Sequence, residues 1–221
     1  MREKKFRDDL GLFVVEGEKM VREALASGLE VEGVWRTEET GEAAMAKISQ
    51  LSTPSPVLAV VRKPAHAAPG NPAGLALALD GVRDPGNMGT ILRTADWFGV
   101  DTVFVSPDCV DVYNPKVIQS TMGSIFRVKV VEEPVTQVCA RYAAAGLPVY
   151  GTLLDGRDIY AAPLRQEGLV VMGNESAGIS AAVRARVTDP LLIPRAPRSG
   201  AESLNVAVAT AVTLSEFRRR R

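Results

Sequence analysis

The sequence predicts an α/β protein in which a mostly parallel sheet carries helices on its faces and follows a smaller α/β unit. Short apolar strand-like runs alternate with helical stretches through the second part of the chain, which is the pattern of such a sheet. Residues 64–74 hold three prolines and two glycines and separate this pattern from a shorter one before it. We therefore expect a first unit at residues 1–63, a linker at 64–74 and a second unit at residues 75–221.

The first unit begins with a strand-like run between Gly11 and Gly17. Apolar residues of Glu18–Ala26 then recur on one helical face, and Gly28 is placed to end that helix. The later elements are a strand at 31–35, a helix at 42–51 and a strand at 57–61. Because the first strand starts near residue 11, a helix leading into it is expected to be missing.

The second unit alternates strands with helices along its whole length. Strands are predicted at 75–79, 102–105, 126–130, 148–152, 169–172 and 191–193, and helices at 87–98, 115–121, 135–145, 180–185 and 202–218. Ligands of open α/β sheets bind outside the carboxyl ends of the strands. The loops that follow the strands are therefore where chemistry is expected.

Composition and charge describe an ordinary folded chain. The 221 residues are 46% hydrophobic and 24% charged, which excludes wholesale disorder. The 26 basic and 26 acidic side chains cancel, so a polyanionic partner would have to meet local basic clusters. Two such clusters are Arg2, Lys4, Lys5 and Arg7 at one end and Arg218–Arg221 at the other, although either could equally be a solvated terminus.

The sequence also excludes several classes of protein. No apolar run approaches the ~20 residues of a membrane span, and the first residues lead into no signal-peptide core. Cys109 and Cys139 lack a CxxC spacing and His66 is the only histidine, so a Cys/His zinc site is excluded. A Ser-His-Asp or Cys-His catalytic triad is also excluded unless it uses His66. We expect a soluble cytoplasmic protein that uses no membrane and no metal.

A first candidate constellation follows the strand that ends near Asp80. A glycine- and proline-rich turn leads into a helix near Asn87, with Gly89 and Arg93 four residues apart on one face. That spacing suits close approach of a phosphate or ribose to the guanidinium. The plainer interpretation is that Asn87 caps the helix, Gly89 serves packing and Arg93 forms a surface ion pair. The glycine spacing does not match GxGxxG, so a dinucleotide fingerprint is not supported.

Two further constellations follow later strands. In the first, Gly173 and Gly178 bracket Glu175, although this stretch could be a polar turn before a helix capped by Ser180. The other lies at the start of the last helix. There, Ser199 and Glu202 match a capping box, and Ser203 and Asn205 add polar side chains to an otherwise apolar turn. If those side chains face inward they need partners, which a ligand could supply.

Together these segments resemble the SpoU family of the SPOUT methyltransferase superfamily, which methylates ribose 2′-hydroxyls in ribosomal and transfer RNA. The pattern N-x-G-x-x-x-R-T-A at 87–95 is similar to its first motif, M-G-N-E with G-I at 172–179 to its second, and I-P with S-L-N-V-A-V-A at 193–209 to its third. All three occur in family order between about residues 75 and 218. The segment 13–25 is similar to the ribosomal-protein-like substrate-binding domain of many members.

The resemblance implies a fold, a cofactor and an assembly. The second unit should contain a deep trefoil knot, one of the rare exceptions to unknotted topology. S-adenosylmethionine should be held by Gly173, Ile193 and Leu204, with Thr152 nearby, and the chain should form a homodimer with the active site near the interface. An apolar stripe at Val206, Ala209, Val212 and Phe217 could serve that interface or the interior of a single chain.

The implied activity is methylation of an RNA ribose 2′-hydroxyl, with ribosomal RNA the more expected substrate and transfer RNA the alternative. Arg93 would be central to the reaction, and Asn87, Glu175, Ser203 and Asn205 would shape the site. A catalytically inactive RNA-binding protein with the same knot is a competing interpretation. A nucleotide-binding oxidoreductase is a third, and it lacks a phosphate-loop fingerprint.

Overall fold

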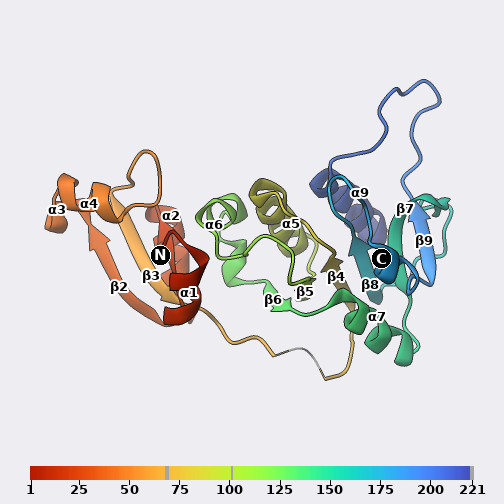
Figure 1. Cartoon of the computed structure of the whole chain (residues 1–221), viewed down its shortest axis with the longest axis horizontal. Helices are drawn as coiled ribbons and strands as arrows, with labels where there is room; N and C mark the ends of the chain where they lie inside the picture. The colour runs from red at the N-terminus through yellow and green to blue at the C-terminus, as the bar shows by residue number, and fades with distance from the viewer. Residues whose placement is uncertain (68–69, 101, 220–221) are drawn as a thin grey trace.

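A computed structural model describes residues 1–67, 70–100 and 102–219. Figure 1 shows an elongated molecule with a small sheet at one end and a larger sheet extending to the other. The small sheet lies before the predicted linker and the large sheet after it. Within the linker, Ala68 and Pro69 lie outside the described residues.

The small sheet has the strand order β1-β3-β2, with both neighbouring pairs antiparallel. Its elements are α1 (Lys4–Leu10), β1 (Leu12–Glu16), α2 (Glu18–Ala26), β2 (Val31–Arg36), α3 (Thr37–Thr40), α4 (Glu42–Ile48) and β3 (Val57–Arg62). The expected absence of a leading helix is wrong, because α1 precedes the first strand. Gly11 ends that helix at φ 66°, a left-handed conformation that glycine adopts without steric cost.

The large sheet confirms the predicted parallel α/β class. Its strands are β4 (Leu75–Leu79), β5 (Thr102–Val105), β6 (Lys129–Glu132), β7 (Val149–Asp158), β8 (Gly168–Met172) and β9 (Asp189–Leu192), in the order β6-β5-β4-β8-β7-β9. Every neighbouring pair is parallel. β6 begins later than predicted, because Ser124–Phe126 form a 3₁₀ turn. β7 runs further than predicted, because it pairs with β9 again beyond an irregularity.

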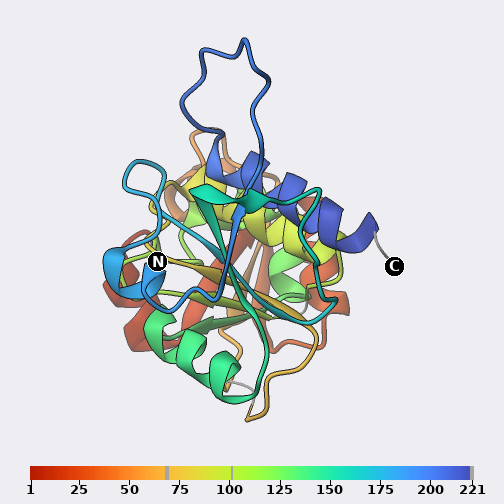
Figure 2. The ribbon, with the colours of Figure 1, turned by 90° about the vertical axis from the view of Figure 1, so that its right-hand side faces the viewer.

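Helices cover both faces of the large sheet, as Figure 2 shows. One face packs against α5 (Pro85–Trp97), α6 (Pro115–Thr121) and α9 (Val206–Arg219), and the other against α7 (Val135–Ala144) and α8 (Ala181–Arg184). The alternation of β4 explains the two layers. Leu77 belongs to the first core and Ala78 to the second, because successive side chains of a strand point to opposite faces.

The small and large sheets share one apolar core. Phe13 of β1 is fully buried, and its ring centroid lies 4.8 Å from that of Tyr113 in the loop before α6. Val117 and Ile118 of α6 belong to the same buried cluster as Phe13. Side chains of the first unit therefore contact the second unit directly, in addition to the chain connection through residues 64–74. That the two units are separate domains stays a prediction.

The α9 helix carries one buried hydroxyl that costs stability. Thr213 is fully buried, and its Oγ1 has no hydrogen-bond partner among the residues that the structure describes. We expect Thr213→Val to raise the free energy of unfolding by about 1 kcal/mol, because the shape is kept while an unpaired polar group is removed. Urea denaturation of both proteins measures this. A lower midpoint in the variant would show that the hydroxyl finds a partner in solution.

Candidate active site at the carboxyl edge of the parallel sheet

The loops after β4 and β8 meet because these two strands are neighbours in the sheet. Asn174 Nδ2 donates to the carbonyl oxygen of Gly81 at 2.6 Å, and the backbone N–H of Ser180 donates to Asp80 Oδ2 at 2.7 Å. These two bonds tie the second constellation to the first. The carboxyl edge of the sheet thus brings both polar loops to one place.

Three predicted site residues form a continuous hydrogen-bonded row there. Asn205 Nδ2 donates to Asn87 Oδ1 at 2.9 Å, and Asn87 Nδ2 donates to Glu175 Oε1 at 3.1 Å. Each residue comes from a different one of the three constellations. The two amides are oriented by this row, because each N–H must face an acceptor.

Glu175 accepts several hydrogen bonds in addition to the one from Asn87. The backbone N–H of Asp84 donates to Oε1 at 3.0 Å, and that of Arg83 donates to Oε2 at 3.3 Å. Burial alone would raise the pKa of Glu175, but the hydrogen bonds from Asn87 and from these backbone groups outweigh it and hold the pKa below its usual value. The carboxylate therefore stays ionised and organises the loops around it.

The caps of the two site helices differ from those predicted. Asp84 caps α5 by accepting from the backbone N–H of Asn87 at 2.8 Å, so the alternative in which Asn87 is the cap is wrong. Asn205 caps α9 by accepting from the backbone N–H of Ala207 at 2.9 Å, so the capping box at 199–202 is also wrong. Ser180 precedes α8 but makes no side-chain cap.

Gly89 serves helix packing. A Cβ atom on Gly89 would lie 2.3 Å from Ser120 Cβ and 2.8 Å from the carbonyl oxygen of Val117, both on α6. The space above this glycine is therefore filled by α6, which leaves no room for a ligand at Gly89 itself.

Arg93 lies outside the row of three. Its side chain is exposed and, within the described part of the chain, forms no hydrogen bond or ion pair, so the surface ion pair considered for it is absent there. Arg93 follows Asn87 by six residues on α5, which places it about 9 Å further along the helix and on another face. Ser203 is likewise exposed and does not join the row.

The predicted cofactor residues flank the same edge. Gly173 is buried, and a Cβ there would lie 2.2 Å from the backbone of Gly178 and Ile179, so this glycine is required by the loop itself. Thr152 Oγ1 donates to the carbonyl oxygen of Val171 at 3.2 Å, between β7 and β8. Ile193 is half-buried, and Leu204 is 49% exposed at the far end of the long loop between β9 and α9.

Sequence reasoning missed two residues that build this site. Asn174 holds its loop through Oδ1, which accepts from the backbone N–H groups of Ser176 and Ala177 at 2.9 and 3.0 Å. Asp84 starts α5, and its signal was an aspartate directly before a proline at the first helical position. The side chains of both residues accept hydrogen bonds from backbone N–H groups, and residue spacing alone does not reveal such bonds.

The two terminal basic clusters are partly engaged by the protein itself. Arg7 is 2% exposed and pairs with Asp111, and Lys4 pairs with Asp8. Arg218 donates to the carbonyl oxygens of Phe98 and Gly99 at 2.7 Å. Arg220 and Arg221 lie outside the described residues.

A hollow of about 670 Å³ lies elsewhere, on the face of the small sheet away from α2. Its lining is largely apolar and includes Phe6, Val14, Trp35 and Leu58. None of the row of three borders it, so the hollow is not the candidate active site.

The described residues define the class of this protein: an α/β protein with a polar site at the carboxyl ends of its parallel strands, joined to a smaller α/β unit. Within those residues, no helix is long and apolar enough to cross a membrane, and no group of three His, Cys, Asp or Glu side chains could hold a metal ion.

The family model described as the SpoU rRNA methylase family matches residues 74–215, more than half of the chain. The chain belongs to this family. A model of the MRM3-like substrate binding domain matches residues 1–44.

Two curated relatives are similar over much of the chain. The 23S rRNA (guanosine(2553)-2′-O)-methyltransferase RlmP of Bacillus subtilis is 35% identical over 97% of this chain and 92% of its own length. The 23S rRNA (uridine(2479)-2′-O)-methyltransferase of Streptomyces viridochromogenes is also 35% identical, over 76% of this chain and 61% of its own length.

Solved structures share the fold of the whole chain. The AdoMet-bound rRNA methyltransferase from Sinorhizobium meliloti has a TM-score of 0.88 at 29% identity, covering 99% of this chain and 91% of that one. The SpoU methyltransferase AviRb from Streptomyces viridochromogenes, in complex with AdoMet, has a TM-score of 0.87 at 28% identity, covering 99% and 94%. The α/β fold predicted from the sequence is thus confirmed.

Proposed function

We propose that this protein transfers the methyl group of S-adenosylmethionine to a ribose 2′-hydroxyl of ribosomal RNA. The observation that carries the proposal is the row Asn205, Asn87 and Glu175, in which all three family motifs meet at the carboxyl edge of the sheet. Membership of the SpoU family supports it. Two relatives are named as 23S rRNA 2′-O-methyltransferases, and two structural neighbours contain AdoMet.

The residues at the sheet edge fit S-adenosylmethionine, which when bound supplies the methyl group from its sulfonium. An adenosine needs apolar surface together with backbone donors and acceptors. Leu204 and Ile193 offer apolar surface, and residues 194–204 are exposed apart from half-buried Ser199. We infer that these two residues and Thr152 contact the cofactor, and that Gly173 permits the close loop backbone beside it. A deep trefoil knot formed by these loops is part of the proposal.

The chain's own residues would orient the ribose and stabilise charge. The role we assign to Arg93 is to hold charge rather than to accept the proton. Its exposed side chain, which pairs with no residue that the structure describes, is suited to hold the target phosphate and to stabilise the developing alkoxide. A neighbouring group or a phosphate oxygen would accept the proton. Ser203 would approach the ribose from the loop that leads into α9.

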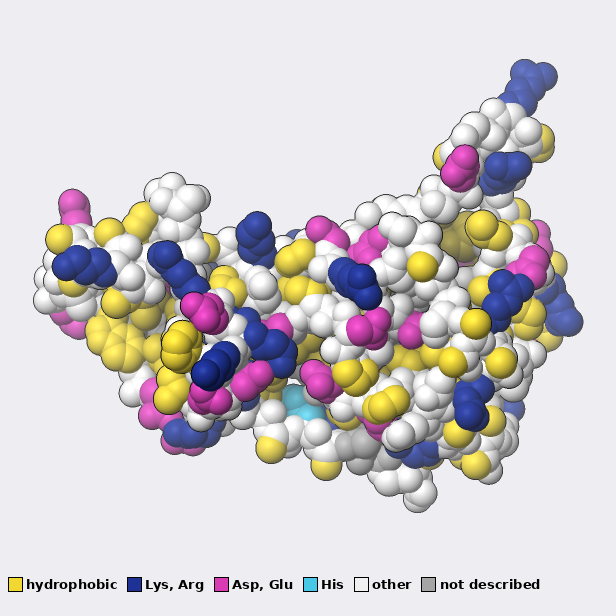
Figure 3. All heavy atoms as spheres, viewed as in Figure 1, with side chains coloured by type: hydrophobic (Ala, Val, Ile, Leu, Met, Phe, Trp, Pro, Cys, Tyr) yellow, Lys and Arg dark blue, Asp and Glu magenta, His cyan; other side chains and the backbone are white. Residues whose placement is uncertain are grey.

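The first unit would recognise the RNA. The match of residues 1–44 to a substrate binding domain supports this role for residues 1–63. In Figure 3, basic and acidic side chains are interspersed over the face drawn, so charge alone does not define an RNA path there. Recognition would rely on shape and on local groups. A cytoplasmic location is part of this proposal.

A homodimer through the second unit would complete the site. Two members of the predicted α9 stripe are used internally, because Val206 is 8% exposed and Phe217 fully buried, while Ala209 and Val212 are half-buried. Exposed apolar side chains of α9 and α5 include Val208, 50% exposed, and Trp97, 83% exposed. Trp97 follows Arg93 by one helical turn on α5, so a partner that covers Trp97 would lie beside Arg93.

We expect Trp97→Glu to weaken this dimer. Loss of a buried tryptophan at an interface costs ~2 kcal/mol or more, which corresponds to at least roughly 30-fold in the dimer dissociation constant. Sedimentation equilibrium over a micromolar concentration series measures it, with Tyr160→Glu, an exposed aromatic of the β7–β8 connection, as the control. Unchanged association in Trp97→Glu would place the interface elsewhere.

The activity is tested by mapping ribose methylation in RNA from a deletion strain and restoring it with purified protein and S-adenosylmethionine. We expect one ribosomal nucleotide to lose its methyl group and to regain it in vitro. If the purified protein instead restores a methyl group on transfer RNA, the substrate is transfer RNA and not ribosomal RNA. Binding of RNA without methyl transfer would favour the inactive RNA-binding protein.

A further inference from the structure

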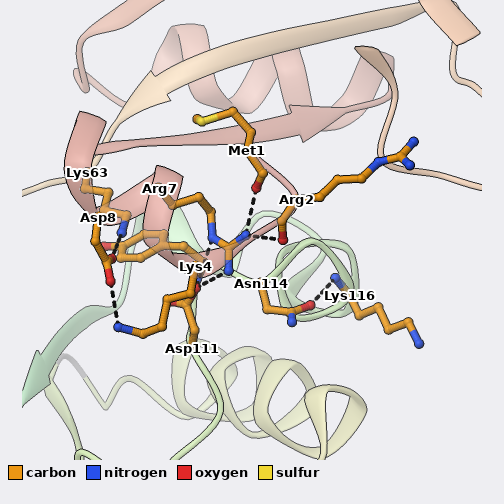
Figure 4. A network of polar contacts seen from close by, with 10 residues as sticks. Met1, Arg2, Lys4, Arg7, Asp8, Lys63, Asp111, Asn114 and Lys116 are labelled. Atoms are coloured by element: carbon orange, nitrogen blue, oxygen red, sulfur yellow. Dashed lines mark hydrogen bonds and ion pairs between the residues drawn. The ribbon is translucent and has the colours of Figure 1, made fainter. Parts of the chain in front are cut away.

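The contact between the first and second units is built around an almost fully buried arginine. Arg7 of α1 is 2% exposed, and its Nε donates to Asp111 Oδ2 at 3.0 Å. Its Nη1 donates to the carbonyl oxygens of Met1 and Arg2, both at 2.7 Å. Figure 4 shows this guanidinium between the chain start and the loop that carries Asp111. Such a charge stays buried only because every polar partner is in place.

The groups around this ion pair extend the contact. Asp8 binds both Lys4 and Lys63, and Lys63 Nζ lies 5.0 Å from the ring centroid of Tyr113. Burial first, and then the Asp111 carboxylate, raise the pKa of Tyr113 to about 12. The phenol is therefore neutral and packs as an apolar group against Phe13.

A second polar contact joins the two units at Arg127. Arg127 Nη1 donates to Glu23 Oε2 of α2 at 2.7 Å, and its Nε donates to Asp96 Oδ2 of α5 at 2.9 Å. Gly123 leaves room for this contact, because a Cβ there would lie 1.9 Å from Glu23 Oε2. The Arg127 side chain is 50% exposed, so solvent screens this contact more than the buried one.

A short packed path leads from this contact to the candidate site. Asp111 precedes α6, whose Ser120 and Val117 lie directly against Gly89 of α5. Gly89 is two residues from Asn87, the middle member of the row of three. A shift of the first unit would therefore move RNA relative to the site, and small misplacements of a reacting group are costly.

We propose that Arg7 and Asp111 are positioning residues for RNA methylation, and that their ion pair, rather than the linker at 64–74, sets where the first unit presents RNA. The inference rests on the proposed function for its kinetic consequence. The fixed position of the first unit relative to the second can be measured without an activity assay.

The test combines a charge change with a change of linker length. Asp111→Asn removes the charge that Arg7 contacts, while its side-chain oxygen can still accept from the backbone N–H of Tyr113, a bond of 3.0 Å at Oδ1. A four-residue Gly-Ser insertion after Asn71 lengthens the linker alone. Arg141→Met is the matched control, because it breaks a two-bond pair with Glu133 inside the second unit.

Kinetics on ribosomal RNA give the first readout. We expect Asp111→Asn to raise the KM for RNA about tenfold, while kcat and S-adenosylmethionine affinity change less than about threefold. The insertion and Arg141→Met should each leave the KM for RNA within about twofold. The insertion added to Asp111→Asn should raise KM beyond the product of the single effects, because the linker matters once the ion pair is gone.

Spin-label distances between Glu39→Cys and Leu154→Cys give the second readout, with the native cysteines replaced by alanine and labelled chains diluted into unlabelled ones. We expect one narrow distribution in the parent and insertion proteins and a broadened one in Asp111→Asn. A raised KM or a broadened distribution from the insertion alone would overturn the inference, as would a narrow distribution in Asp111→Asn. A parent protein that keeps a narrow distribution but methylates no RNA would contradict the proposed function alone.

Discussion

Arg93→Ala should slow methyl transfer by roughly 10²–10³-fold, the effect of removing a group that stabilises developing charge by ~3–4 kcal/mol. The side chain is exposed and, among the described residues, unpaired, so the folded protein loses no contact of its own. An interaction made mainly in the transition state lowers turnover far more than ground-state binding. Cofactor affinity should therefore stay within about threefold, or ~0.7 kcal/mol. Single-turnover methylation of ribosomal RNA from a deletion strain, beside calorimetric titration with S-adenosylmethionine, measures both.

Arg93→Lys separates charge from geometry in the same assay. A lysine supplies a point charge without the planar fork that can bind a phosphate through two parallel bonds, so little activity should return. Full activity in the lysine variant would mean that a positive charge at this position is enough for catalysis and that the two-bond geometry of arginine is not needed. Should Arg93→Ala keep its activity, or lose it only because the cofactor no longer binds, Arg93 is structural.

The sheet and most helices could be predicted because apolar periodicity is a local property. β4, β5 and β8 lie almost where the pattern placed them, since buried parallel strands are short continuous apolar runs. The strand predicted at 126–130 begins only at Lys129, because the apolar residues before it, such as buried Ile125, lie in a 3₁₀ turn. Helix α1 was missed because its polar sequence has little apolar periodicity, and its C-terminal cap at Gly11 was the available signal.

The site could be predicted only in part because its contacts are long-range. Asn87 and Glu175 are 88 residues apart, and they meet because β4 and β8 are neighbours in the sheet order. Strand order is not visible in apolar periodicity, and the motifs placed these residues together only through resemblance. The spacing between Gly89 and Arg93 did not reveal their different surroundings: α6 packs against Gly89, whereas Arg93 is exposed and lies outside the row.

Gly173 shows how a motif residue can matter for a reason other than ligand contact. A side chain at this position overlaps the backbone of Gly178 and Ile179, so Gly173→Val would distort the loop that carries Glu175. Loss of cofactor binding in that variant would not distinguish a ligand contact from a damaged loop. Leu204→Ala is the cleaner probe of the cofactor contact, because Leu204 is 49% exposed.

Asn205→Asp should lower methyl transfer by roughly 30–150-fold with little loss of stability. Asn205 has two roles on separate atoms: Oδ1 caps α9 by accepting from the backbone N–H of Ala207, and Nδ2 donates to Asn87 Oδ1. Aspartate is an equally good cap at a helix N-terminus, so α9 should keep its start. It cannot donate to Asn87, and it brings a second carboxylate toward Glu175. Water solvates the exposed side chains of residues 205 and 175 in the free protein, whereas a misplaced Asn87 amide costs ~2–3 kcal/mol in the transition state, which is the predicted rate effect.

Asn205→Ala completes the test because it removes both roles. It should lose similar activity and, in addition, about 1 kcal/mol of stability from the missing cap. Single-turnover methylation and urea denaturation of the three proteins separate the two atoms. If Asn205→Asp is fully active while Asn205→Ala is slow, the residue acts only by starting α9, and the row of three is not part of the reaction site. If Asn205→Asp is slow and as stable as the parent, the bond to Asn87 orients the amide on which the ribose is placed.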